Sequence, residues 1–466
     1  MGAENNWTLP PITTSFIDCI FADEKPPEQN LIDHLSNTIL PFGDSQLESA
    51  QISGGKSLSS FAKNRSKERI ELILKYEGSR NYSPGDSVGI IPQNRPEEVD
   101  ELLRLLDLES KADALVRLRL IDGSKKKLPP YLPLDTTPRY LLTNVIDIRG
   151  ILKKAFLRSL AEFTSDTADR NFILGLCSKE GSTKYNEIVL RQQFLLCDFL
   201  RQRPSCKPPL HLLLEHLPRL LPRAYTIASS PKRYPNQIRI VFTVVTTTSG
   251  KPGICTSWLK EKYESFADLS TQVANLKLSS DEKINDPICD QVLLYFRKPN
   301  DFRCPDPGIP SILIGPGSGI APFVGFLEHL ACEGGCQKSE KNIDRCLYFG
   351  CRYPNEDQIY KDDMEGFMSR GVLTKNRVCF SRDPEKSNNC KYVQDLLYED
   401  RDEIYELMKN RNCKIFVCGD ASHMAKDVDA TILTILREKS GITNEEAVLE
   451  LKELEKSKRY MKDVWR

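Results

Sequence analysis

The feature that most constrains the fold is an alternation of short apolar segments with helical segments in the C-terminal third of the chain. The apolar segments cover residues 312–314, 346–349, 378–380 and 414–418, and stretches with helical spacing lie between them. This alternation is typical of a doubly wound parallel sheet with helices on both faces. We therefore predict an α/β domain over residues 306–466.

The preceding part of the chain has a different pattern. Apolar residues alternate around Ile70, Leu72 and Leu74 as they do in a strand, and strand-like segments recur at residues 88–91, 238–246 and 292–297. Between these segments the spacing of leucines is mostly helical. The sequence predicts a β-rich domain over residues 56–305 that carries a helical insertion at about residues 100–218.

Residues 1–55 are rich in Pro, Asn, Asp and Ser and show little periodicity. This composition predicts a linker or tail, with a short amphipathic helix around Asn30–Ile39.

Composition excludes several classes of protein. The 65 basic and 65 acidic residues give no net charge, which argues against a protein that binds nucleic acid through its backbone. No apolar run approaches the 18 residues that a membrane span needs, and the N-terminus lacks the pattern of a secretory signal. The 15 cysteines form no CxxC pair, so we expect reduced thiols, no metal site and a cytoplasmic location.

A glycine-rich turn follows the first predicted strand of the α/β domain. It reads GPGSGIAPF over residues 315–323 and includes Gly317 and Ser318. Glycines between a strand and a helix let the backbone approach a pyrophosphate and direct N–H groups toward it. The turn is neither the GxGxxG fingerprint nor a P-loop. The alternative is a tight strand–helix junction without a ligand.

Two further groups lie at the predicted ends of strands in this domain. Ser381, Arg382 and Lys391 combine a hydroxyl with two cations, which suits a phosphate monoester because Arg can bind it in a bidentate manner. Cys418 lies where the last predicted strand ends, and ligands of open α/β sheets bind at that edge. The alternatives are a solvated charge cluster and a small buried hydrophobic residue.

Upstream, the segments RAYTIASS (223–230) and GICTSWL (253–259) form another pair of candidates. The first offers Arg223 for a pyrophosphate, Tyr225 for stacking and Thr226 for a hydrogen bond. The second offers Gly253 and Thr256 at the start of a predicted helix, which is a second anion site. Either segment alone is a weak signal, whereas both before a dinucleotide-like domain form a specific combination.

These segments, taken in order, resemble the ferredoxin–NADP reductase half of the diflavin reductase family. The resemblance rests on YSPGDSVGIIPQN, RAYTIASS, GICTSWL, GPGSGIAPFVGFLEH, YFGCR, FSRD with KYVQD, VCGDASHMAKDV and RYMKDVW, and it covers about residues 60–466. Within the family, IRGILKKAFLRSLAEFTSD and LCSKEG are similar to the branch that reduces methionine synthase. The resemblance implies an FAD-binding antiparallel β-barrel with a helical connecting insertion, followed by an NADP-binding domain.

The resemblance also implies the residues of a flavin site. Thr226, Cys418, Asp463 and Trp465 would be catalytic, with Trp465 stacked on the flavin and moving aside for nicotinamide. Aromatic rings on the two flavin faces would exclude water while hydride passes between the cofactors. The implied FAD-binding residues are Arg223, Ala224, Tyr225, Thr226, Gly253, Ile254, Cys255, Thr256 and Trp465.

The NADP site is implied in the same way. Ser381, Arg382 and Lys391 would bind the 2′-phosphate, and Tyr392 would lie against the adenine. The full set of implied NADP-binding residues is Lys67, Gly317, Ser318, Ser381, Arg382, Lys391, Tyr392, Val393, Gln394 and Asp427. Thr226 stands where the family has serine, and Arg466 follows Trp465 as a cation near the proposed site.

The relatives carry an N-terminal FMN domain, which needs on the order of 150 residues. Only about 60 residues precede the predicted barrel here, so we do not expect this chain to bind FMN. The implied activity is hydride transfer from NADPH to FAD, with electrons passed to methionine synthase directly or through a separate flavodoxin-like carrier. The alternatives are a catalytically quiet binding or chaperone partner of methionine synthase, and a truncated form of a full diflavin reductase.

Overall fold

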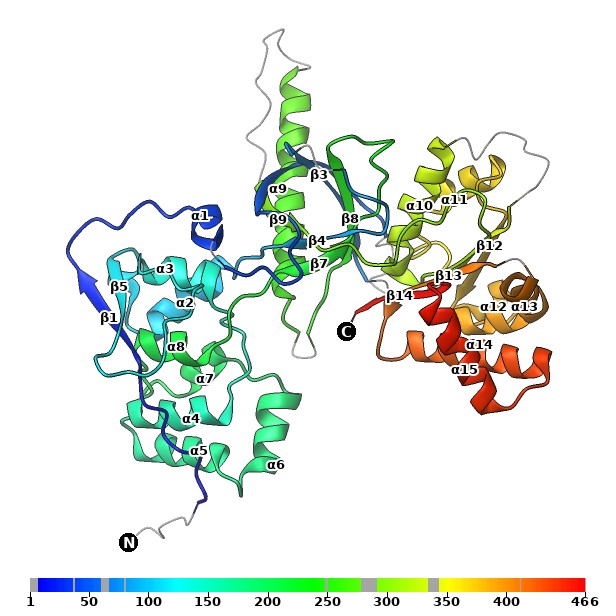
Figure 1. Ribbon diagram of the computed structural model, residues 1–466. Coiled ribbons are helices and arrows are strands. Elements are labelled where there is room, and N and C mark those ends of the chain that lie inside the picture. The colour runs from blue at the N-terminus through cyan, green and yellow to red at the C-terminus, as the bar shows by residue number, and fades with distance from the viewer. Residues whose placement is uncertain are drawn as a thin grey trace. The chain divides into compact units, whose positions relative to one another are not determined.

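The computed structural model describes residues 7–36, 38–59, 67–78, 81–247, 250–277, 291–333, 343–410 and 412–465 (Figure 1). Arg466 lies outside these residues. The chain divides into two compact units. We call Met1–Leu40, Ile91–Arg223 and Thr246–Trp258 the helical unit, and Pro41–Ile90, Ala224–Val245 and Leu259–Arg466 the sheet unit.

The helical unit contains the predicted insertion. Its core is rich in leucine and includes Leu102, Leu157 and Leu213, which the short helices bury against one another. Local signals set several helix starts: Pro96 is at the first position of α2, and the Asp166 side chain accepts a hydrogen bond from the N–H of Asp169 at the start of α5. The helices are α1 Leu31–Ser36, α2 Pro96–Leu105, α3 Pro138–Tyr140, α4 Lys154–Leu160, α5 Thr167–Cys177, α6 Ser182–Tyr185, α7 Leu196–Gln202 and α8 Leu210–His216.

This unit also contains a small antiparallel sheet that the sequence analysis does not predict. Its order is β1-β5-β6, with β1 at Ile17–Ala22, β5 at Leu115–Leu120 and β6 at Asp135–Thr136. The predicted linker over residues 1–55 is therefore corrected at β1, and the helical interpretation is corrected at β5. The strand β1 becomes regular because β5, about a hundred residues away, supplies its hydrogen-bond partners.

A six-stranded antiparallel sheet opens the sheet unit. Its order is β7-β4-β9-β2-β3-β8. An isolated bridge between Ile227, just after β7, and Ile240 of β8 joins the two outer strands, so the sheet curls back on itself without a continuous closing ladder in the described residues. The bounds are β2 Glu48–Ser57, β3 Arg69–Tyr76, β4 Ser87–Ile90, β7 Arg223–Thr226, β8 Gln237–Thr243 and β9 Gln291–Phe296. The strand β2 begins within the predicted linker and ends two residues beyond it.

The predicted doubly wound domain is confirmed. Its parallel sheet has the order β12-β11-β10-β13-β14, with β10 Ser311–Ile314, β11 Arg345–Cys351, β12 Lys375–Phe380, β13 Lys414–Asp420 and β14 Tyr460–Trp465. Alternate residues of each strand face opposite cores, as the pleat of a strand requires: Leu313 packs with α10 and α11, whereas Ile312 packs with the remaining helices. The helices are α10 Ala321–Cys332, α11 Lys361–Ser369, α12 Val393–Glu399, α13 Arg401–Asn410, α14 Met424–Ser440 and α15 Asn444–Lys456.

A buried group of charged side chains joins the two sheets of the sheet unit. Arg239 of β8 places Nη2 2.5 Å from Oε1 of Glu328 in α10, and Nη1 3.4 Å from Oε2 of Glu71 in β3. The hydroxyl of Tyr360 donates to the same Glu71 carboxylate. Burial raises the pKa of Glu328, against the lowering effect of Arg239.

Candidate functional site

The glycine-rich turn of the parallel sheet lies between β10 and α10. Gly317 has a φ of 59°, a left-handed conformation that favours glycine. A Cβ atom on Gly319 would lie 2.2 Å from the carbonyl oxygen of Cys418 in β13. The turn therefore packs directly against the end of a neighbouring strand. Only glycine allows this approach at position 319. A glycine-rich backbone before a helix has the chemistry that a pyrophosphate requires.

Three of the four predicted catalytic residues lie together. The Thr226 hydroxyl donates a hydrogen bond of 2.5 Å to Oδ2 of Asp463. Asp463 of β14 is the register partner of Cys418 in β13. Burial raises the pKa of Asp463, while the Thr226 hydrogen bond and the charge of Arg297 lower it. Burial also raises the pKa of the Cys418 thiol, with a further contribution from Asp463, so the thiol is neutral at physiological pH.

The fourth residue, Trp465, ends β14. Its side chain is 44% exposed, and its carbonyl accepts a hydrogen bond of 2.9 Å from the N–H of Ala421. The backbone of this residue is thus held in the sheet while its ring remains open to solvent. An exposed aromatic ring at a strand end is available for stacking.

The predicted NADP residues follow several of the parallel strands. Ser381 and Arg382 come directly after β12, and their backbone N–H groups donate to Cys351 and Arg352 at 2.8 and 3.0 Å. Because β10 to β14 pair in parallel, their carboxyl ends lie at one edge of the sheet. The glycine turn, Ser381, Cys418 and Trp465 therefore share that edge.

The second part of this group lies at the start of α12. Asp395 accepts hydrogen bonds of 2.8 Å from the N–H groups of both Lys391 and Tyr392, and the Lys391 ammonium lies 5.5 Å from the centre of the Tyr392 ring. Val393 is the buried first residue of the helix, and Nε2 of Gln394 lies 3.5 Å from Oδ2 of Asp427.

Three other predicted NADP residues have few side-chain contacts with the described residues. Ser318 has a weak contact, 3.5 Å from the hydroxyl of Thr243. Lys67 is exposed just before β3, and no contact within the described chain joins it to the sheet edge. Arg382 is also exposed, and its guanidinium forms no ion pair with the residues that the structure describes.

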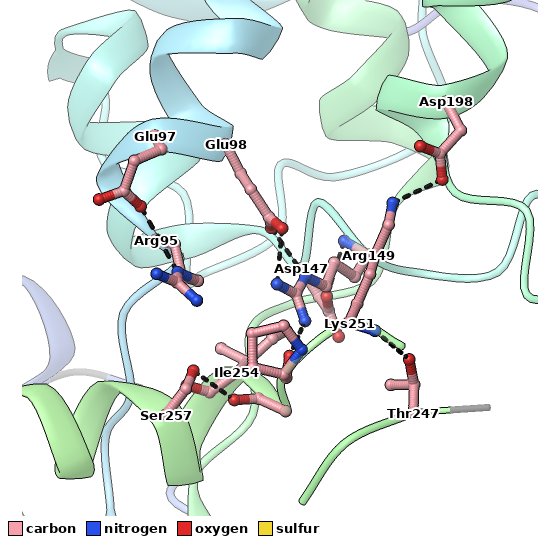
Figure 2. Close-up of polar contacts among 12 residues, drawn as sticks. Arg95, Glu97, Glu98, Asp147, Arg149, Asp198, Thr247, Lys251, Ile254 and Ser257 are labelled. Carbon is pink, nitrogen blue, oxygen red and sulfur yellow. Dashed lines mark hydrogen bonds and ion pairs between the residues drawn. The ribbon is translucent and has the colours of Figure 1, made fainter. Parts of the chain in front are cut away.

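The other predicted anion site is in the helical unit, at the start of α9 (Ile254–Lys277). Figure 2 shows the polar contacts around it. The carbonyl of Gly253 accepts hydrogen bonds from the N–H and the hydroxyl of Ser257, at 3.1 and 2.6 Å, which closes the first turn. Cys255 is buried, and Thr256 is partly exposed. The N–H groups of such a first turn attract anions.

Two ion pairs hold the loop before this helix. Arg149 binds both carboxylate oxygens of Glu98 in α2, at 2.7 and 2.6 Å, and also donates to the carbonyl of Pro252. Lys251 pairs with Asp198 of α7 at 2.5 Å. Both clamps are visible in Figure 2. They tie the loop to the helical insertion.

Asp147 links this network to Arg223. Its Oδ1 accepts a hydrogen bond of 3.0 Å from the N–H of Arg149. Burial raises the pKa of Asp147, and the charges of Arg223 and Arg149 lower it. The Arg223 guanidinium also donates to the carbonyl of Leu221 at 2.7 Å.

Sequence reasoning missed Glu98, Asp147, Arg149 and Lys251. Arg149 falls within a segment that carries the family resemblance, but its partner Glu98 is 51 positions away. No local pattern joins such a pair. An alignment showing both positions changing together is the signal that could have found it.

Comparisons with known proteins agree with this architecture. The family model of an FAD binding domain matches residues 41–258, and the model of an oxidoreductase NAD-binding domain matches residues 313–430. Within the described residues, no helix has both the length and the apolar character to cross a membrane.

Individual relatives are similar over most of this chain. Mouse methionine synthase reductase is 35% identical, covering 99% of this chain and 66% of the relative. The human methionine synthase reductase is 37% identical, over 83% of this chain and 56% of the relative. House fly NADPH–cytochrome P450 reductase is 34% identical, over 86% of this chain and 56% of the relative. The chain thus spans 56–66% of the length of these relatives. The chain contains an FAD-binding domain and an oxidoreductase NAD-binding domain, and it is similar over most of its length to these reductases.

Proposed function

We propose that this chain transfers hydride from NADPH to FAD. Electrons then pass to the cobalamin of methionine synthase, directly or through a separate flavodoxin-like carrier. The observation that carries the proposal is the contact of Thr226 with Asp463, beside Cys418, at the sheet edge that also holds the glycine-rich turn. The names of the most similar relatives support the acceptor. We also propose a cytoplasmic location, where the described cysteines would stay free thiols.

The residues of each unit, taken separately, fit one part of an FAD molecule. The first turn of α9 offers N–H groups from Ile254, Cys255 and Thr256, and Arg223 adds a cation. These groups would bind the diphosphate. The partly exposed ring of Tyr225 would stack on the flavin, with Ala224 beside it, and Trp465 would cover the other face.

The residues at the sheet edge fit NADPH. The turn has no room for a Cβ atom at Gly319 and a left-handed backbone at Gly317, and its N–H groups would receive the pyrophosphate. Arg382 and Lys391 are exposed cations, and Ser381 adds a hydroxyl, so these residues would bind a 2′-phosphate. Tyr392 is 48% exposed, and its ring would lie against an adenine.

FAD, when bound, supplies the ring that accepts hydride from nicotinamide. The chain itself would orient the two rings and control the polarity around them. Asp463 orients the Thr226 hydroxyl by accepting a hydrogen bond from it. The raised pKa of Asp463 means that this carboxyl holds a proton more readily than an exposed aspartate. The Cys418 thiol is neutral, so it adds no negative charge to the site.

An anaerobic titration of the purified protein with NADPH tests the proposal. We expect bound flavin whose visible absorbance bleaches as NADPH is added. A colourless protein, or flavin that NADPH does not bleach, would overturn it. Thr226→Val should slow bleaching, because the hydroxyl is lost, while Thr226→Ser should retain the rate.

The electron acceptor needs a separate measurement. Purified methionine synthase, with its cobalamin, is mixed with the reduced chain in the presence and absence of a flavodoxin. Reduction of the cobalamin, followed by its absorbance, is the expected result. No reduction under either condition would exclude this acceptor.

A further inference from the structure

The Arg149 side chain is fully engaged and largely buried. Its Nε and Nη2 atoms bind the two oxygens of Glu98 at 2.7 and 2.6 Å, and the two side chains are 8% and 24% exposed. The remaining terminal nitrogen donates to the carbonyl of Pro252. A bidentate pair fixes the plane of the guanidinium, and hence the direction in which its third donor points.

The carbonyl that Arg149 holds is close to the proposed flavin site. Pro252 precedes Gly253, whose own carbonyl accepts the first hydrogen bonds of α9 from Ser257. The proline ring fixes the backbone torsion φ at that position. Arg149 therefore sets the position of the chain two residues before the helix begins.

A second anchor holds the same loop. Lys251 pairs with Asp198 at 2.5 Å, and its N–H donates to the Thr247 hydroxyl at 3.1 Å. The N–H of Thr247 in turn donates to the Lys251 carbonyl at 2.7 Å. Thr247 and Lys251 are thus joined to each other. Lys251 pairs with α7, and the neighbouring Pro252 is held by Arg149, which pairs with α2 (Figure 2).

The backbone of Arg149 is also linked, through Asp147, to the other proposed diphosphate ligand, Arg223. The Arg149 N–H donates to Asp147, whose carboxyl interacts electrostatically with Arg223. The short segment 147–149 thus touches the loop before α9 and acts on Arg223. Two proposed ligands that are distant in the sequence share one support.

We propose that Arg149 is a positioning residue for the diphosphate of FAD, holding the first turn of α9 in place through the Pro252 carbonyl. This inference rests on the proposed function, because it assumes that FAD binds there. Arg149 itself contacts no flavin atom in this scheme. Its effect passes through the loop.

Flavin-free full-length protein, prepared as the unaltered chain and as Arg149→Met, provides the test. Binding of FAD, ADP and riboflavin is measured by fluorescence or calorimetry. We expect Arg149→Met to weaken FAD and ADP by about tenfold or more, since misplaced groups lose their aligned contacts. Riboflavin has no diphosphate, so its affinity should not change. Arg149→Lys should recover only part of the loss, because an ammonium cannot form the fork.

Arg139→Met is the matched control. Arg139 pairs with Asp100 of the same helix α2, but it does not touch the loop. Its variant should bind FAD normally. Equal affinity of Arg149→Met and the unaltered chain for FAD would overturn the inference, as would an equal loss for riboflavin.

Amide hydrogen exchange adds a measurement that needs no flavin. Peptides covering residues 250–258 should exchange faster in Arg149→Met, while those of α5 should not change. General unfolding would accelerate both and would overturn a specific positioning role. Failure of the unaltered chain to bind FAD would overturn the proposed function itself, whereas normal binding by Arg149→Met would overturn only this inference.

Discussion

The two proposed anion cradles of this chain are held in different ways. In the sheet unit, the turn around Gly317 and Gly319 fits against Cys418 through bare backbone. In the helical unit, the loop before α9 is held by the side chains of Arg149 and Lys251. Both cradles precede a helix, so both offer N–H groups to a phosphate. Only the means of holding the backbone differs.

The two cradles therefore depend on different parts of the sequence. Close packing of glycines depends on residues within the turn and on one strand end beside it. Ion-pair clamps depend on partners elsewhere in the chain. The first type should fail abruptly when a side chain is added, whereas the second should weaken in steps as clamps are removed.

The largest expected effect is that of Gly319→Ala. The new methyl group would lie 2.2 Å from the carbonyl oxygen of Cys418, so the strand or the turn must move. We expect a loss of about 3 kcal/mol in the free energy of unfolding, together with loss of NADPH-dependent flavin reduction. Denaturant titration measures the first quantity. Gly308→Ala is the control, because nothing lies within 4 Å of its Cβ position. A stable, active Gly319→Ala protein would contradict the packing argument.

The next effect concerns the cofactor rather than the fold. Arg382→Gln should raise KM for NADPH on the order of tenfold and leave KM for NADH unchanged, because only NADPH carries the 2′-phosphate. Steady-state flavin-dependent reduction of an artificial acceptor measures both constants. Arg370→Gln is a suitable control, since this exposed arginine at the end of α11 donates to Gly366 instead. Equal changes for the two nucleotides would refute the assignment.

Removing one clamp should have a smaller effect. Lys251→Gln loses a partly exposed ion pair, for which about 1 kcal/mol is an upper expectation, so FAD affinity should fall about threefold. The difference should shrink at high salt because the pair is screened. Lys260→Gln serves as the control. Lys260 lies further along α9 and pairs with Glu68, which directly precedes β3. A loss of FAD affinity as large as that expected for Arg149→Met would show that the two ion pairs do not act in separate steps.

The smallest effect is a pH dependence of stability at Asp463. Its pKa is raised above the ordinary 3.8, chiefly by burial. The folded state therefore holds the proton more tightly than the unfolded state. The resulting stabilisation is complete below the unfolded pKa and is lost as pH rises through the folded pKa.

Asp463→Asn removes this dependence while keeping an oxygen that can accept from Thr226. The variant should melt slightly above the unaltered chain at neutral pH, and the difference should vanish toward pH values of about 4. Calorimetry across this range measures it. A variant that melts lower at neutral pH than at acidic pH, relative to the unaltered chain, would reverse the sign and contradict the argument.

Local patterns predict most of the fold. The segments 312–314 and 414–418 became β10 and β13 because continuous apolar runs suit strands buried on both faces. The paired strands β1 and β5 of the small sheet were missed. Ile17 and Leu118 are regular only through their cross-strand pairing, which single-segment patterns do not contain.

The candidate site divides in the same way. Gly317, Thr226 and Asp463 lie in recognisable motifs, and the structure brings Thr226 and Asp463 into contact. The cofactor roles of these residues remain predictions. Arg149 and Glu98 were not predicted, because an ion pair across 51 positions has no local signature.

The buried charges between the two sheets have a consequence for how the chain folds. Glu328 belongs to one sheet's helix, and its counterion Arg239 belongs to the other sheet. Leaving a buried carboxylate without its partner costs about 3–5 kcal/mol. The two sheets should therefore melt in a single cooperative transition, and a fragment that begins at β10 should be unstable in isolation.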